Sequence, residues 1–277
     1  IWSCPPSAMG AFPVATFVRF FHNHGLLQIA DRPQWFTVPG GSRRYVERMR
    51  SALPRVSLGR PVRRVAPDRR GGWSVAIDGV VANYEQVVFA CHADQALAML
   101  DSPTEREASV LGAFRFQSNV AILHADRALL PRRERIWSAW NYIASDDAQS
   151  APVGCSYLLN RLQPLPFTSP LVLTMNPPRA PRDDRVLARF TYAHPIFDRR
   201  AIVAQRELAG IQGRRGLWFG GAWTRYGFHE DGLASGLAMA SALGAEPPWR
   251  QSGARSERET PATSSIAPTP ATLGIVT

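Results

Sequence analysis

Residues 220–233 read GGAWTRYGFHEDGL, and this stretch constrains the fold more than any other. It follows the apolar residues 217–219 and precedes the small-residue run 234–244. The pattern predicts a strand, a glycine-rich turn and a helix. The first N–H groups of a helix are unpaired and carry partial positive charge, so such an end binds phosphate or a developing anion. A strand–turn–helix packed tightly on itself would satisfy the same pattern.

The rest of the chain alternates helical and strand-like segments. We expect helical turns in 5–29, and a helix to about residue 53 that Ser42 caps after the Gly40-Gly41 turn. Runs with a period of two predict strands, and longer apolar runs with small residues predict further helices. The expected strands are 62–65, 73–77, 85–90 and 217–221, and the further helices are 92–100, 201–212 and 232–243.

Residues 112–200 have a different pattern. Strand-like segments such as FRFQSNVAILHA and VLARFTYAHP are separated by turns rich in Pro and Asp. This pattern favours an antiparallel sheet, which would form a second domain or a large insertion. After Trp249 the chain becomes rich in Ser, Thr, Ala and Pro, so we expect residues 250–277 to be a disordered tail.

The formal net charge is +10, and all 32 basic residues are Arg. The arginines occur as scattered pairs and not as one basic tract, so nucleic-acid binding is not expected. The charge still favours anionic partners such as phosphates, fatty acids or membrane surfaces. No apolar run is long enough to predict a transmembrane segment, and peripheral membrane contact is left open.

The three cysteines, Cys4, Cys91 and Cys155, are far apart and have no metal-binding spacing. They fit small buried thiols in a reducing, cytoplasmic setting, and we expect no metal site. No signal peptide is visible. The chain opens at Ile1 with IWSCPPSAMG, from which we expect a fragment that lacks its own start.

Several phrases, in order from residue 1 to about residue 245, carry a resemblance. They include FTVPGGSRRYVERM, VVFACHADQAL, FRFQSNVAILH, YAHPIFD and WFGGAWTRYGFHEDGL. With them the chain resembles the flavin-containing amine oxidase superfamily, which includes monoamine oxidases, phytoene desaturases and protoporphyrinogen oxidase. It looks closest to bacterial FAD-dependent, NAD/FAD-binding amine-oxidase-like proteins.

The resemblance implies an α/β fold of mixed α+β character. It would be the C-terminal part of a Rossmann-like FAD-binding domain with an inserted antiparallel-sheet substrate domain. The implied segments are a helical part of the substrate domain (1–35), a part of the FAD-binding domain (36–91), the substrate domain with its sheet (92–204), the C-terminal part of the FAD-binding domain (205–249) and the tail (250–277).

The resemblance also implies which residues hold FAD. Gly220 and Gly221 match the glycines that lie against the pyrophosphate and ribityl chain. The helix start matches the backbone that meets the pyrimidine edge of the flavin, where N–H donors would stabilise the negative charge of the reduced ring. The residues at this helix start are Glu230, Asp231, Gly232 and Leu233, while Gly40 and Gly41 match the family's glycine doublet and Val62 matches an adenine contact.

Aromatic residues of the same loop match positions that line the substrate pocket in front of the flavin. These are Trp223, Tyr226 and Phe228, and they are followed by His229. His229 titrates near neutral pH, so it is either a catalytic residue or one that only caps or packs. Trp137 and Trp140 would line the pocket or fill the core of the sheet, and the core is the better expectation.

The chain departs from the family in two ways. It lacks the GxGxxG motif and the distant acidic residue that hold pyrophosphate and ribose, so it is either truncated upstream or a remnant that cannot hold FAD tightly. It also has no Lys, whereas many amine oxidases use a Lys that hydrogen-bonds a water at flavin N5. Desaturase, isomerase or alcohol-oxidation chemistry therefore fits as well as amine oxidation.

These features together predict an FAD-dependent oxidoreductase. It would transfer a hydride from a C–H bond of an apolar or amphipathic small molecule to the flavin, although this fragment alone would be inactive. The main alternative is a catalytically inactive flavin-fold remnant or binding module. A basic protein that acts on nucleic acid or membrane is the third hypothesis, and the ordered phrases argue against it. Substrate identity, electron acceptor, flavin attachment and oligomeric state stay undecided.

Overall fold

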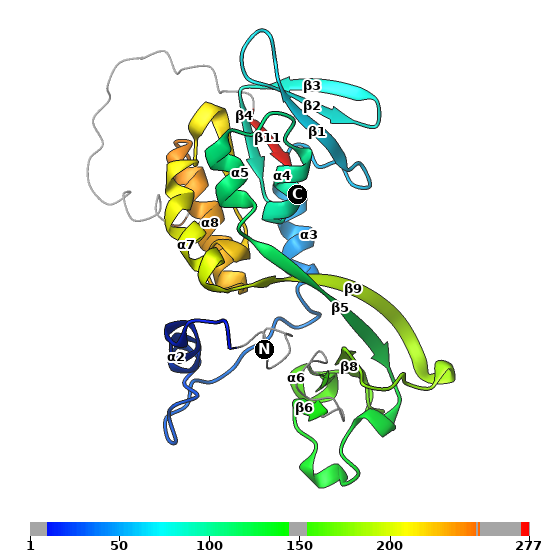
Figure 1. Cartoon of the computed structure of the whole chain (residues 1–277). Coiled ribbons are helices and arrows are strands. Elements are labelled where there is room, and N and C mark those ends of the chain that lie inside the picture. Colours follow the sequence, from blue (N-terminus) through cyan, green and yellow to red (C-terminus); the bar gives the residue numbers. More distant parts are fainter. Residues whose placement is uncertain (1–9, 144–153, 248, 250–272, 277) are drawn as a thin grey trace, which may run out of the picture. The chain divides into compact units, whose positions relative to one another are not determined.

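A computed structural model describes residues 10–143, 154–247, 249 and 273–276. The chain forms two compact units, and each is described by itself below (Figure 1). The first unit takes residues 1–57 and 116–199, and the second takes residues 58–115 and 200–277. The sequence predicted segment boundaries at residues 36, 92, 205 and 250, and the assignment of these segments to an FAD-binding domain and a substrate domain stays a prediction.

The second unit contains two small sheets. Strands β1 (Val62–Pro67), β2 (Trp73–Ile77) and β3 (Val80–Tyr84) form an antiparallel meander, drawn in cyan in Figure 1. Strand β4 (Gln86–Phe89) lies between β10 (Leu217–Phe219) and β11 (Leu273–Val276) and is parallel to both. Parallel strands are covered on both faces, which is why β4 and β10 are short continuous apolar runs and not alternating ones.

Helices and 3-10 turns complete the second unit. The rings of Phe89 and Phe219, both fully buried, stack with centroids 5.3 Å apart and fix the register of β4 against β10. The helices are α4 (Ala93–Met99), α5 (Glu105–Leu111), α7 (Arg199–Glu207) and α8 (His229–Ala242), and the 3-10 turns are η4 (Leu208–Gly210), η5 (Arg214–Gly216) and η6 (Ala222–Thr224).

The first unit is built on a five-stranded sheet with the order β6-β7-β8-β5-β9, and the pairs β6–β7, β7–β8 and β8–β5 are antiparallel. Its strands are β5 (Arg115–His124), β6 (Trp140–Ile143), β7 (Gly154–Leu158), β8 (Val172–Met175) and β9 (Val186–Ile196). Its helices are α2 (Val14–Asn23), α3 (Arg43–Ala52) and α6 (Leu159–Leu162), with 3-10 turns η1 (Arg127–Leu129), η2 (Glu134–Ile136) and η3 (Asp183–Arg185).

One face of this sheet buries a chain of polar side chains. His124, Thr174 and Ser156 are fully buried. The imidazole Nδ1 of His124 accepts a hydrogen bond from the backbone N–H of Asp126 at 3.0 Å, so its Nε2 carries the proton and donates to Thr174 Oγ1 at 2.7 Å. The hydroxyls of Thr174 and Ser156 lie 2.7 Å apart. Every member is satisfied, so the network specifies one register among the three strands.

The main features of the predicted fold are confirmed. The structure has mixed α and β elements with antiparallel sheets, and the strands expected near 62–65, 73–77, 85–90 and 217–221 are β1, β2, β4 and β10. The expected helices near 92–100, 201–212 and 232–243 are α4, α7 and α8. Elements that were not predicted include β3 and α5, and the capping box of Thr104 and Glu107 marks the start of α5.

Two local predictions differ from the structure. Ser42 does stand directly before α3, but its side chain makes no capping hydrogen bond there. The disordered-tail prediction fails for Leu273–Val276, because this apolar segment supplies the strand β11 that pairs with β4. The rest of that prediction falls on residues 250–272 and 277, outside the described residues.

Within the described ranges, no helix is both long and apolar enough to span a bilayer.

The buried His124 predicts a pH dependence of stability. Burial lowers its pKa, so the fold favours the neutral imidazole relative to an unfolded chain with a pKa of about 6.5. The stabilisation is therefore present above about pH 6.5 and is lost as the pH falls below that value. We expect urea unfolding to show a lower free energy of unfolding at pH 5.5 than at pH 7.5, with a smaller difference in His124→Gln.

A matched control for this effect is His22, which is exposed. His22→Gln should leave the difference between the two pH values unchanged. An equal difference in the natural sequence and in His124→Gln would show that another group causes the pH dependence.

Candidate functional site

The connection from β10 to α8 places the glycine pair of the motif against the helix. The backbone N–H of Gly220 donates to the Phe89 carbonyl at 2.9 Å, so Gly220 continues the parallel ladder. A methyl group at Gly220 would overlap the end of Met239 and lie 3.3 Å from Ser235 Oγ. Gly221 has φ 144° and ψ 172°, a conformation open essentially to glycine alone. Gly221 is therefore required by its backbone conformation, whereas Gly220 lets the end of the Met239 side chain pack against the strand.

The residue Ser235 joins the two elements. Its Oγ accepts a hydrogen bond from the Gly221 N–H at 2.9 Å and donates to the Gly232 carbonyl at 2.8 Å. A small polar side chain is thus needed at this position of α8, which explains part of the small-residue pattern by local packing.

The first loop aromatic, Trp223, lies in the core of the second unit. It is 3% exposed, and its indole N–H donates to the Cys91 carbonyl at 3.0 Å. Its ring meets Phe114 edge to face with centroids 4.6 Å apart. The structure therefore gives Trp223 a packing role, and the pocket-lining role that the sequence suggested for it stays a prediction.

The acidic residue of the motif fixes the loop in front of the helix. Asp231 is 7% exposed, although it belongs to the first turn of α8. Its Oδ2 accepts from the backbone N–H of Phe228 at 3.0 Å and of Tyr226 at 3.2 Å. A carboxylate in the first turn also complements the helix dipole. The sequence assigned Asp231 to the cofactor, and the structure shows that its carboxylate holds the loop.

One face of α8 carries glycines that packing within the second unit does not explain. A methyl group at Gly232 would meet nothing closer than the Ala222 nitrogen at 3.8 Å, and one at Gly236 would meet nothing within 4 Å. Neither residue has a positive φ. Glycine inside a helix costs about 1 kcal/mol relative to alanine. This face, which includes the half-exposed Leu233, is therefore open to close approach by a group that is not part of α8's own packing.

The other residues at the helix start are accessible. His229 and Glu230 are both exposed. Of the amides in the first turn of α8, those of Asp231 and Gly232 donate to the Phe228 carbonyl at 3.0 and 3.2 Å, so the positive end of the helix dipole is the main feature this start offers to an anion. The second unit therefore brings Gly220, Gly221, Gly232 and Leu233 to one connection, as the motif suggested.

Two further predicted contacts lie elsewhere in the chain. Gly40 and Gly41 form the turn before α3 in the first unit, both with φ near 80°. Val62 begins β1 in the second unit. Their roles at a cofactor stay predictions.

The two described cysteines are free thiols. Burial raises the pKa of Cys91 to about 11 and also raises the pKa of Cys155. Both therefore remain protonated near neutral pH, so they are weak nucleophiles. Both are half-buried, where the sequence suggested buried thiols. Cys4 lies outside the described residues. Among those residues, no group of three His, Cys, Asp or Glu side chains could hold a metal ion.

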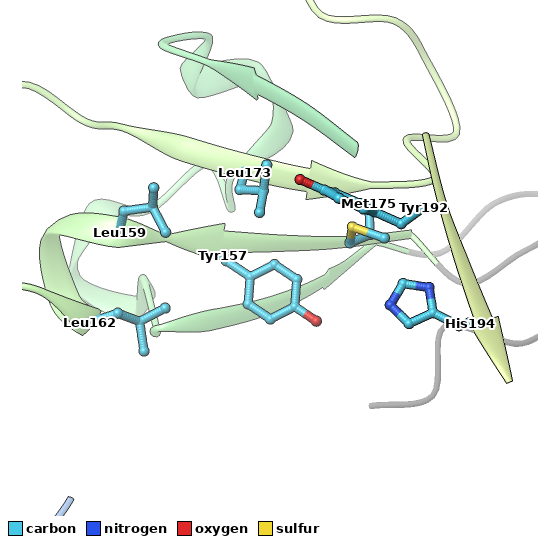
Figure 2. A pocket seen from close by; sticks show the side chains of 7 residues that line it. All are labelled: Tyr157, Leu159, Leu162, Leu173, Met175, Tyr192 and His194. Carbon is cyan, nitrogen blue, oxygen red and sulfur yellow. The ribbon is translucent and has the colours of Figure 1, made fainter. Parts of the chain in front are cut away.

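A cavity of about 410 Å³ lies on the sheet of the first unit (Figure 2). Successive residues of a strand point to opposite faces, so this is the face opposite to the buried His124 network. Figure 2 shows Tyr157 and His194 on the same side of the sheet as the apolar side chains. The lining residues are Tyr157 of β7, Leu159 and Leu162 of α6, Leu173 and Met175 of β8, and Tyr192 and His194 of β9.

A polar side chain cluster borders this apolar cavity. Asn119 Nδ2 lies 2.9 Å from His194 Nδ1, and Asn119 Oδ1 accepts from Asn176 Nδ2 at 2.7 Å. Asn119, itself held by Asn176, thus orients the imidazole. Burial is the main cause that raises the pKa of Tyr157 to about 12, so its phenol stays neutral. The sequence analysis missed these residues, because an alternating strand does not reveal which of its two faces is hollow.

The two tryptophans considered for this region have different positions. Trp137 packs against the buried cluster of Leu130, Leu158 and Val172, and its indole N–H donates to the Pro131 carbonyl at 2.7 Å. The core position expected for Trp137 is confirmed. Trp140 is 50% exposed and meets the Tyr157 ring edge to face at 5.6 Å, so the core position expected for it is wrong.

Comparisons with known proteins address the fold. No family model matches the chain, and no curated protein matches it.

Solved structures do match. A protein named as a protoporphyrinogen oxidase from Exiguobacterium sp. is 13% identical with a TM-score of 0.54, and the match covers 83% of this chain and 57% of that one. A fatty acid isomerase from P. acnes that produces CLA is 13% identical with a TM-score of 0.53, covering 73% of this chain and 52% of that one. A reduced UDP-galactopyranose mutase is 12% identical with a TM-score of 0.50, covering 72% and 50%.

These matches concern the fold. The chain shares the mixed α/β fold of these enzymes, and it spans about half the length of each of them. One of the three carries the name of a group in the superfamily that the sequence resembles, so the fold expected from that resemblance is confirmed. At such identities the likeness extends to the fold and not to substrates.

The loop contact of Asp231 can be tested by mutation. Asp231→Ala removes the acceptor of two backbone N–H groups, so we expect the free energy of unfolding to fall by about 1–3 kcal/mol. Urea unfolding measures this difference. Asp231→Asn keeps one acceptor oxygen and should lose less.

The neighbour Glu230 provides the control, because it is exposed on the same helical turn. Glu230→Ala should change the free energy of unfolding by no more than about 0.5 kcal/mol. If Asp231→Ala were as stable as Glu230→Ala, the carboxylate would not hold the loop.

Proposed function

We propose that this chain supplies the C-terminal half of an FAD-dependent oxidoreductase. The observation that carries the proposal is the α8 face at Gly232 and Gly236, where added methyl groups would meet almost nothing. This face follows the strand β10 in a fold shared with a protein named as a protoporphyrinogen oxidase. A flat ring system is the kind of group that such a glycine-bearing helix face can approach closely.

The residues present fit FAD at this connection. The backbone of Gly220 and Gly221 would lie against its pyrophosphate and ribityl chain. The helix start at Glu230, Asp231 and Gly232 would face the pyrimidine edge, where the helix dipole favours negative charge. The N–H groups of Asp231 and Gly232 themselves donate to the Phe228 carbonyl, so the dipole and not these two donors would act on the ring. FAD supplies the acceptor for a hydride from a substrate C–H bond. Leu233, half exposed on α8, would add an apolar contact.

The substrate in this proposal is an apolar or amphipathic small molecule. The cavity on the sheet of the first unit supports this class, because leucine, methionine and tyrosine side chains line it. Binding there would remove apolar surface of the ligand from water, which favours apolar ligands. His194, held by Asn119, would give the ligand a defined polar contact. His229 remains the proposed catalytic residue because its imidazole is exposed at the helix start, beside the proposed flavin site.

The chain's lack of lysine bears on the reaction type. This chain has no lysine that could hydrogen-bond a water molecule at flavin N5, as many amine oxidases do. We therefore propose oxidation of a C–H bond next to carbon or oxygen alongside amine oxidation. Nucleic acid is not among the proposed partners, and the proposed location is the cytoplasm.

The test is flavin content in protein expressed from the complete natural reading frame. We expect bound FAD, released on denaturation and identified by its fluorescence. Gly232→Val should abolish or strongly reduce that content while the free energy of unfolding changes by less than about 1 kcal/mol, because a Cβ at this position meets nothing closer than 3.8 Å.

The control is Ala238→Val, which places the same valine side chain at an exposed position of the same helix. It should leave flavin content unchanged. Equal flavin content in Gly232→Val and the natural sequence would contradict the placement of FAD at α8. Absence of flavin from the natural protein would instead favour the inactive flavin-fold module.

A further inference from the structure

A second cavity, of about 360 Å³, lies entirely within the second unit. It sits where η5 leads into β10, at the amino end of that strand, whereas Gly220 and Gly221 follow the carboxyl end. It is therefore separate from the candidate flavin site. Its lining residues are Thr104, Arg106 and Glu107 from the start of α5, and Gly210, Ile211, Arg214 and Arg215 from the turns before β10.

The turn that carries Arg214 and Arg215 is held in place by backbone contacts. The N–H of Gly213 donates to the Leu217 carbonyl at 2.8 Å, and the N–H of Gly216 donates to the Gly213 carbonyl at 3.2 Å. Gly216 has φ 76°, and a methyl group there would overlap the Glu85 carbonyl. The turn is thus pressed against the segment before β4 and cannot move without disturbing the sheet.

Arg215 has a backbone conformation that its side chain disfavours. Its φ is 55°, a left-handed value that is uncommon for a residue other than glycine. Its carbonyl accepts a hydrogen bond from the Trp73 indole N–H at 2.6 Å, and its guanidinium lies 5.0 Å from the centroid of the same ring. Backbone strain of this kind persists where surrounding structure enforces it, and it is concentrated at binding sites.

The charge of Arg215 is already matched within the protein. Its guanidinium pairs with Glu107, which is 1% exposed and also accepts from the Thr104 N–H at 2.8 Å. The pair holds α5 against η5. Among the described residues, the other two guanidinium groups that line the cavity, those of Arg106 and Arg214, pair with no carboxylate, so the lining has a local excess of two positive charges.

The guanidinium of Arg106 lies close against Gly210. A methyl group at Gly210 would overlap the Arg106 guanidinium. Gly210 does not have a positive φ, so its backbone does not need glycine for conformational reasons. The glycine makes room for the guanidinium at the wall of the cavity.

We propose that this cavity binds a small molecule that bears a phosphoryl group. A phosphate monoester carries a charge of about −1.5 to −2 at pH 7, which complements the two uncompensated guanidinium groups. Guanidinium groups form paired N–H bonds to phosphate oxygens. The partly apolar wall at Ile211 gives room for the organic part of the ligand.

Phenyl phosphate is the probe, titrated calorimetrically into the whole chain at constant ionic strength. Arg106→Gln and Arg214→Gln should each weaken binding about tenfold, the effect of losing one charge-assisted hydrogen bond. Gly210→Ala should also weaken it, although the net charge is unchanged. Binding should strengthen between pH 5.5 and 7.5, as the monoester loses its second proton with a pKa of about 6.

Arg63→Gln is the matched control, because Arg63 is an exposed arginine on β1 in the same unit. It should leave affinity unchanged. Equal losses in Arg63→Gln and Arg106→Gln would overturn the proposal, since they would indicate general attraction to a basic surface. Equal binding of benzoate would overturn the phosphoryl class, and absence of phenyl phosphate binding would overturn the site. None of these outcomes depends on flavin content, so the proposed function is tested separately.

Discussion

The parallel pairing of β4 with β10 is the contact on which the second unit depends. It joins Phe89 to Phe219 across 130 residues of chain, and the stacked rings fix the register. From this register follow the hydrogen bond of the Gly220 N–H to Phe89 and the contact of Trp223 with Cys91. The side chain of Gln212 bonds both the N–H and the carbonyl of Phe219, so it also satisfies the backbone of the short strand β10. Bringing together two residues so distant in sequence costs conformational entropy of the chain between them. The burial of the two aromatic rings offsets this cost.

The two ends of strand β10 lead to segments of different chemical character. Strand β10 begins after the arginine-bearing turn and ends at the glycine pair. A strand of three residues spans only about 10 Å. The positive charges at the amino end and the helix start beyond the carboxyl end therefore lie within one small unit, and the field of the guanidinium groups adds to that of the α8 dipole for any anion nearby.

The sequence predicted the fold best where local pattern and tertiary packing agree. Strands β1 and β2 and helix α8 were located because turns and periodicity mark their ends. Strand β3 was missed because its valines are mostly exposed on an edge, which weakens the alternation. The tail strand β11 was missed because four apolar residues in a polar, low-complexity stretch have no local signal, and only their pairing with β4 defines them.

The candidate site was predictable only in part for a similar reason. The glycines of the β10–α8 connection follow from the motif, but the motif does not reveal that Gly220 serves packing while Gly232 does not, or that Asp231 binds its own loop. The cavity beside His194 could not be found from sequence, since its residues come from four separate elements. Trp140 shows the limit most clearly, because an aromatic residue in a strand gives no indication of which face it joins.

The chain enters and leaves the inserted sheet through two neighbouring strands, and this arrangement bears on how the protein can evolve. Strand β5 brings the chain into the insertion and β9 takes it out, and the two are hydrogen-bonded neighbours at one edge of the sheet. A segment whose entrance and exit are adjacent can be exchanged, enlarged or trimmed as a cassette while the flanking domain retains its connections. Changes confined to β6, β7 and β8 would then diversify ligand choice independently of the glycine-bearing helix, so that recombination could act on specificity without rebuilding the rest of the protein.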